Sequence, residues 1–155
     1  MPRREPEYGE PDFAFCGLKV WIHGREFPKS LDYWDGNWID VTATCDSSNA
    51  SVEVRGVILH LTELQHLCGL IETMQRELSG KQELECMEPY LTFVFNVEKT
   101  GAVDFKLIVK PNPLTAEEHT FHFEIDQSYF PMFVQQCRSV LKRYPIVGKA
   151  TNVAG

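Results

Sequence analysis

The fold is organised around the stretch Tyr33-Trp34-Asp35-Gly36-Asn37-Trp38-Ile39, which places two of the three tryptophans of the chain on either side of a turn. Asp-Gly and Gly-Asn are dipeptides that reach the positive φ values of tight turns, and apolar residues alternate on both sides of them. The stretch therefore predicts a corner between two strands. Large rings at such a corner can close one end of a core or form an exposed patch, and the pattern is compatible with both.

Alternation of apolar and polar residues predicts three strands around this corner. The first covers residues 13–22 as one strand, with Gly17 as a bulge that changes which face points inward. The second and third cover residues 38–45 and 51–59, with a polar turn between them. Short links of this kind predict an antiparallel meander.

The clearest predicted helix follows this meander. Thr62 is the predicted N-cap, Gln65 completes a capping box, and Gly80 lies just beyond the helix end. Apolar residues recur at helical spacing on one face, which we expect to lie on the sheet: Leu64, Leu67, Cys68, Ile71, Met74 and Leu78.

The second half of the chain repeats the order of strands followed by a helix. Strands are predicted near residues 83–86, 90–98, 103–109 and 121–125. A second amphipathic helix follows, which Ser128 or Asp126 can cap and which Pro145 ends.

The predicted fold class is therefore α+β, with a mostly antiparallel sheet of about seven strands and two amphipathic helices packed on it. Its order is three strands, a helix, about four strands and a helix. We expect a single domain over residues 12–147, a disordered arm over 1–11 and a flexible tail over 148–155.

Composition limits the classes of partner and the compartment. The 155 residues carry 15 Lys and Arg against 22 Asp and Glu, so the net charge is −7. Such a surface repels phosphate backbones and favours a basic protein partner over nucleic acid. The sequence has no long apolar run, so we expect no membrane span and no secretory signal. Five scattered cysteines predict reduced thiols in a cytoplasmic protein.

Motifs for chemistry are few. His119 and His122 are three residues apart in a predicted strand, so they point to opposite faces and do not form a chelating pair. No Cys-x-x-Cys, Gly-x-Ser-x-Gly or Gly-rich phosphate motif is present. We therefore expect no catalytic residue, no metal site and no cofactor.

Acidic and aromatic residues gather instead near predicted strand ends. Aromatic anchors among carboxylates are typical of a surface that binds a basic partner, although many such rings are buried in cores. The candidate partner-binding residues are Asp32, Tyr33, Trp34, Asp35, Asn37 and Trp38 at the corner, Glu88 beside Pro89, and Asp126 and Gln127 before the second helix.

Four segments in this order resemble the WapI-like immunity proteins of bacteria. They are Ile22-His-Gly-Arg25, Asp32-Tyr-Trp-Asp-Gly-Asn-Trp-Ile39, Cys86-Met-Glu-Pro89 and Phe123-Glu-Ile-Asp-Gln-Ser-Tyr129. The resemblance covers roughly residues 13 to 147, and the Trp-Asp-Gly-Asn-Trp core is its most specific part.

This resemblance implies a small cytoplasmic protein that protects its own cell. Proteins of this kind bind the toxic C-terminal domain of a contact-delivered polymorphic toxin, which in the founding case is a nuclease acting on transfer RNA, and they inhibit it by stoichiometric occlusion. The alternative hypothesis is a small-ligand-binding or enzymatic domain, which predicts a deep pocket with Glu88 or a histidine of perturbed pKa.

Overall fold

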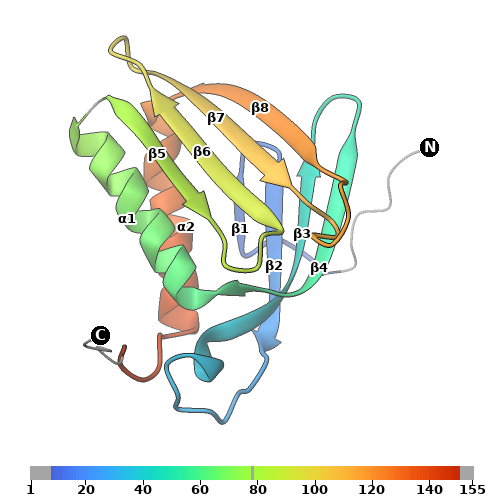
Figure 1. Ribbon diagram of the computed structural model, residues 1–155. Helices are drawn as coiled ribbons and strands as arrows, with labels where there is room; N and C mark the ends of the chain where they lie inside the picture. Colours follow the sequence, from blue (N-terminus) through green and yellow to red (C-terminus); the bar gives the residue numbers. More distant parts are fainter. Residues whose placement is uncertain (1–7, 78, 151–155) are drawn as a thin grey trace, which may run out of the picture.

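The computed structural model describes residues 8–77 and 79–150. Its elements confirm the predicted α+β class, with antiparallel strands and two helices (Figure 1). The strands of the described residues number eight, and they form two separate four-stranded sheets. Alternation identifies the buried face of a strand but not its sheet, so the division was not apparent from the pattern.

The N-terminal sheet is an antiparallel meander in chain order. It is followed at once by the first helix. The elements of this half are β1 (Phe13–Phe15), β2 (Leu18–Arg25), the short 3₁₀ helix η1 (Asp35–Asn37), β3 (Trp38–Asp46), β4 (Ser51–His60) and α1 (Leu61–Glu77).

The C-terminal sheet is a second antiparallel meander. It leads through a 3₁₀ turn into the second helix. The elements of this half are β5 (Gly80–Glu85), β6 (Leu91–Val97), β7 (Ala102–Val109), β8 (His119–Asp126), η2 (Gln127–Tyr129) and α2 (Phe130–Arg143).

The single strand predicted over residues 13–22 is wrong, because the chain reverses there. Phe15 pairs with Leu18, which makes Cys16 and Gly17 a two-residue turn between β1 and β2. Cys16 has a φ of 55°, and a Cβ on Gly17 would lie 2.0 Å from the Asp46 carbonyl oxygen. Gly17 is therefore needed for close approach of the backbone, and it does not form a bulge.

The predicted helix start at Thr62 is also wrong. The helix begins at Leu61, and Glu63 is the residue whose carboxylate reaches back, accepting a 2.9 Å hydrogen bond from the His60 backbone N–H. This is the reciprocal half of a capping box, moved two residues toward the N-terminus. Leu78, which we placed on the apolar helix face, lies outside the described residues.

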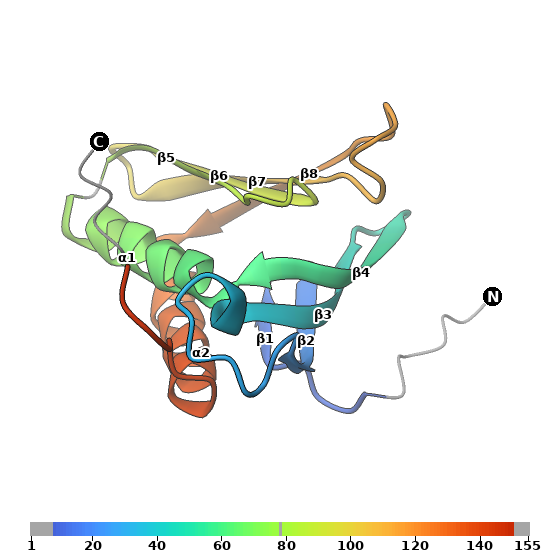
Figure 2. The ribbon, with the colours of Figure 1, turned by 60° about the horizontal axis from the view of Figure 1, so that its bottom comes forward.

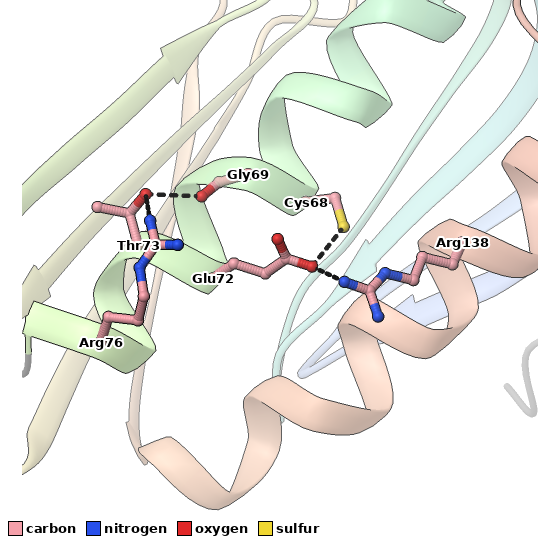
Figure 3. A network of polar contacts seen from close by, with 6 residues as sticks. All are labelled: Cys68, Gly69, Glu72, Thr73, Arg76 and Arg138. Carbon is pink, nitrogen blue, oxygen red and sulfur yellow. Dashed lines mark hydrogen bonds and ion pairs between the residues drawn. The ribbon is translucent and has the colours of Figure 1, made fainter.

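The two sheets form two layers, and both helices lie together at one side of them (Figure 2). Helix α1 contacts α2, β4 and β5, whereas α2 contacts β1. Between the helices, the Glu72 carboxylate accepts from the Cys68 thiol at 3.7 Å and pairs with Arg138 of α2 (Figure 3). This polar link lies at the solvent side of an otherwise apolar contact.

The core is centred on phenylalanine rings from all layers. Phe15 of β1 has its ring centroid 5.1 Å from Phe105 and 6.1 Å from Phe95 of the C-terminal sheet, and 4.5 Å from Phe133 of α2. All four side chains are buried. Burying such rings removes large apolar areas from water, and these contacts hold the two sheets and the helix to each other.

Truncation of Leu107 would measure how much a cavity in this core lowers the free energy of unfolding. The Leu107 side chain is fully buried, whereas Leu114 is 96% exposed only seven residues later. Leu107→Ala should lower the free energy of unfolding by about 2–5 kcal/mol, because the cavity adds to the lost transfer free energy. Leu114→Ala is the matched control and should change it by less than about 0.5 kcal/mol. Urea denaturation of both variants gives the two values, and equal values would contradict the proposed core.

Thiol reactivity provides a second test of the fold. All five cysteines are free, and four of them are buried. Burial raises the pKa of Cys16 to about 11 and that of Cys45 and Cys137 to about 12. Since the thiolate is the reactive form, we expect very slow labelling by a disulfide reagent near pH 8 in the native protein. In denaturant all five thiols should react rapidly, and fast native labelling of three or more would contradict this packing.

Candidate functional site

The loop between β2 and β3 carries most of the candidate partner-binding residues, and its turn is built by Asp32. The Asp32 carboxylate accepts hydrogen bonds from the backbone N–H of Trp34 at 3.0 Å and of Asp35 at 2.8 Å. The Asp32 carbonyl accepts from the Gly36 N–H at 2.8 Å. This side-chain-to-backbone pattern fixes η1 and leaves the Asp35 side chain exposed.

Asn37 joins this turn to the segment that follows α2. Its side-chain amide donates to the carbonyls of Tyr33 at 2.6 Å and Val147 at 3.0 Å, and its Oδ1 accepts from the Val147 N–H at 2.9 Å. The Asn37 side chain is fully buried. Buried amides are stable only when their polar atoms are satisfied, so Asn37 has a structural role at this position.

Arg25 and Gly36 complete the same junction. The Arg25 guanidinium donates to the Gly36 carbonyl at 2.7 Å and also to the Pro145 carbonyl. A Cβ on Gly36 would lie 2.5 Å from the Val147 Cγ2 atom, which leaves no room for any other residue without a shift. We call these contacts of Arg25 and residues 33–37 with residues 145–147 the C-terminal clasp.

The rings of Trp34, Trp38 and His60 pack together next to this loop. The His60 ring lies 4.9 Å from the Trp38 ring and 5.4 Å from the Trp34 ring. His60 Nε2 is 3.0 Å from the Trp34 carbonyl, which can only accept, so Nε2 carries the proton. His60 Nδ1 is 2.5 Å from the Thr62 hydroxyl oxygen, which completes the hydrogen bonding of the ring.

The corner therefore contains both a core ring and an exposed ring. Trp38 is buried, whereas Trp34 is 52% exposed. Asp32 and Asp35 are exposed beside Trp34 in the sequence, and Tyr33 is half-buried. The side chains that can reach a partner from the motif are thus Trp34, the two carboxylates and part of Tyr33.

Glu63 connects the β5–β6 loop, which carries Glu88, to this corner. One carboxylate oxygen of Glu63 accepts from the His60 N–H and the other accepts from the Met87 N–H at 2.8 Å. Because His60 also donates to Trp34, a chain of three hydrogen bonds joins the β5–β6 loop to η1. Glu88 is exposed on that loop, next to the exposed Met87.

Asp126 and Gln127 lie elsewhere. Asp126 pairs with Ala102 in the sheet register, beside the hairpin between β6 and β7, at the end of the molecule opposite η1 (Figure 1). Its carboxylate accepts from the Ser128 N–H at 2.8 Å, and hydrogen bonds from Ser128 lower the pKa of Asp126. Asp126 caps η2, whereas the predicted capping of α2 by Ser128 or Asp126 is wrong, because α2 follows Tyr129 without a side-chain cap. Both residues line a separate open depression of about 790 Å³.

Two exposed apolar residues near Trp34 were missed from the sequence. Phe27 is 49% exposed and Leu31 is 82% exposed, both in the segment between β2 and η1. One signal was available in the sequence: both residues are large and apolar, and they lie in a segment that contains Pro28 and has neither strand nor helix periodicity. Apolar residues outside such periodic patterns are candidates for exposed positions.

The described residues contain neither a metal-binding cluster nor a helix that could span a membrane. Within residues 8–77 and 79–150, no three His, Cys, Asp or Glu side chains are grouped so that they could hold a metal ion. Neither α1 nor α2 combines the length and the apolar character that crossing a bilayer requires.

The C-terminal clasp can be tested at Asn37. Asn37→Ala should lower the free energy of unfolding by about 1–3 kcal/mol, because partly buried backbone groups of Tyr33 and Val147 lose their partners. It should also increase the amide hydrogen exchange of Val147. Asp35→Asn, two residues earlier with an exposed side chain, is the control and should change stability by less than about 0.5 kcal/mol. Unchanged exchange at Val147 in Asn37→Ala would show that the clasp does not hold residues 145–147.

Comparison with known proteins places this arrangement in a family. No curated protein and no solved structure matches the chain. A family model described as the Immunity protein WapI-like family matches residues 11–145, which include the whole loop from β2 to β3 and both helices. The predicted resemblance is confirmed, and the chain belongs to the WapI-like family of immunity proteins.

Proposed function

We propose that this protein neutralises a cognate contact-delivered toxin by binding the toxin's C-terminal domain with one-to-one stoichiometry in the cytoplasm. Membership of an immunity protein family supports a general role in immunity. Occlusion needs only a stable, complementary surface and no chemistry by the inhibitor, so the inhibitor is a binding protein and not an enzyme.

The observation that carries this proposal is the position of Trp34. The residue is 52% exposed, while its backbone is held through Asp32 on one side and His60 on the other. A rigid, exposed tryptophan loses little conformational entropy on binding, which is why this residue is enriched among interface hot spots. Trp34 is therefore the proposed anchor of the complex.

Charge supports a basic partner. Asp32 and Asp35 flank Trp34 in the sequence, and Glu88 lies on the loop that Glu63 ties to the same corner. The chain carries a net charge of −7, which speeds encounter with a positively charged protein. Nucleases need a positive surface to bind phosphate backbones, so we propose that the toxin is a nuclease.

The candidate partner-binding residues lie at two ends of the molecule, and each end could contact the toxin. Asp126 and Gln127 lie beside Tyr129, which is 50% exposed and thus comparable to Trp34. We propose that the toxin contacts the η1 end, with Asp32, Trp34, Asp35 and Glu88, and that Asn37 and Trp38 support this surface from inside. Asp126 and Gln127 then lie outside the contact.

Co-expression tests this function. The chain should protect cells from the C-terminal domain of a large secreted protein encoded in the adjacent open reading frame. Trp34→Ala should weaken the complex by about 30-fold or more, the loss typical of a hot-spot ring, with no change in the far-ultraviolet circular dichroism spectrum. Isothermal titration calorimetry with a catalytically inactive toxin gives the dissociation constant and the stoichiometry.

Tyr129→Ala is the matched control, because it removes an equally exposed ring from the opposite end. Its complex should bind as the wild type does. A loss with Tyr129→Ala but not with Trp34→Ala would move the contact to the Asp126 end. Absence of both binding and protection would refute the immunity function for that pair.

A further inference from the structure

An open depression lies beside the proposed anchor. Its volume is about 580 Å³, and its walls are mostly apolar because Phe27 and Pro28 form much of them. Two carboxylates and one ammonium group stand among these walls. The complete lining is Glu26, Phe27, Pro28, Lys29, Ser30 and Asp35.

The two carboxylates of this depression are free to bind a cation. Several neighbouring or buried acids are engaged: Asp32 accepts from the Trp34 and Asp35 N–H groups, Glu63 accepts from two backbone N–H groups, and Glu72 pairs with Arg138. Among the described residues, the Glu26 and Asp35 carboxylates have neither a hydrogen-bond donor nor an ion-pair partner. They therefore keep the full acceptor capacity of ionised carboxylates.

The backbone that carries these groups is held in place. The Glu26 N–H donates to the Trp38 carbonyl at 3.0 Å, and the Ser30 N–H closes a turn onto the Phe27 carbonyl at 3.1 Å. On the opposite wall, the Asp35 N–H donates to the Asp32 carboxylate. The backbone positions of Glu26 and Asp35 are consequently fixed before a partner binds, so only their side chains lose freedom on binding.

We propose that this depression receives an arginine side chain of the toxin. The aliphatic stem would cover Pro28, the guanidinium would stack on the Phe27 ring, and its fork of N–H donors would reach Glu26 and Asp35. Lys29 contributes one positive charge against two negative ones and makes a second cation in the depression unfavourable. This inference rests on the proposed function and names the chemistry that the anchor face recognises.

A peptide titration tests the depression without the toxin. Acetyl-Gly-Arg-Gly-amide is added to the isotopically labelled full chain, with the citrulline peptide as a neutral isostere. The arginine peptide should shift the amide resonances of Glu26, Phe27 and Asp35 in a saturable way, with a dissociation constant on the order of millimolar for one exposed contact. The citrulline peptide should bind at least about tenfold more weakly, because it lacks the charge.

Charge-removing variants complete the test. Glu26→Gln/Asp35→Asn should abolish the difference between the two peptides and weaken the toxin complex by about tenfold or more. Glu53→Gln/Glu98→Gln removes the same total charge from exposed positions outside the depression and should change neither result. A lysine peptide that binds more tightly than the arginine peptide would overturn the arginine assignment.

The two proposals fail in different ways. If Trp34→Ala weakens the toxin complex but Glu26→Gln/Asp35→Asn leaves both the complex and the peptide response unchanged, the arginine site is refuted and the immunity function stands. If the adjacent toxin does not bind, the immunity function fails for that pair, and the arginine and citrulline titrations still decide the site. Equal responses to the two peptides refute it.

Discussion

The fold depends on the contact between two sheets whose strands form separate hydrogen-bond ladders. Phe15 carries much of this contact, since its ring reaches Phe95 and Phe105 across the layers and Phe133 of α2. The tight turn at Cys16 and Gly17 places β1 at the sheet edge where α2 can cover it. Apolar burial is non-directional, so it fixes which faces meet, while the turns and caps fix the register.

The motif around η1 contains buried residues that stabilise the loop and exposed residues at its surface. Gly36, Asn37 and Trp38 are buried, and the first two make room for the end of the chain or bind it. Trp34 and Asp35 point to solvent from the same turn. A single short segment thus carries both the scaffold and the surface.

The fold class could be predicted because alternation and helical spacing report burial, which local sequence encodes well. The division of strands into two sheets could not, since pairing depends on contacts between distant segments. At the site, Trp34, Asp32 and Asp35 were identified by composition, but the buried state of Asn37 depends on Val147, 110 residues away. Phe27 and Leu31 were missed because their segment has no period, and the opposite placement of Asp126 follows from topology alone.

The C-terminal clasp also has a consequence for biogenesis. Residues 33–37 leave the ribosome long before residues 145–147, yet the conformation of the loop uses hydrogen bonds from both segments. During translation, Trp34 and its neighbours therefore lack the hydrogen bonds with residues 145–147 until α2 and the segment after it have been synthesised. Quality control by chaperones can act on the nascent chain in this interval. The conformation of the loop at Trp34 is in this way coupled to the synthesis of residues 145–147.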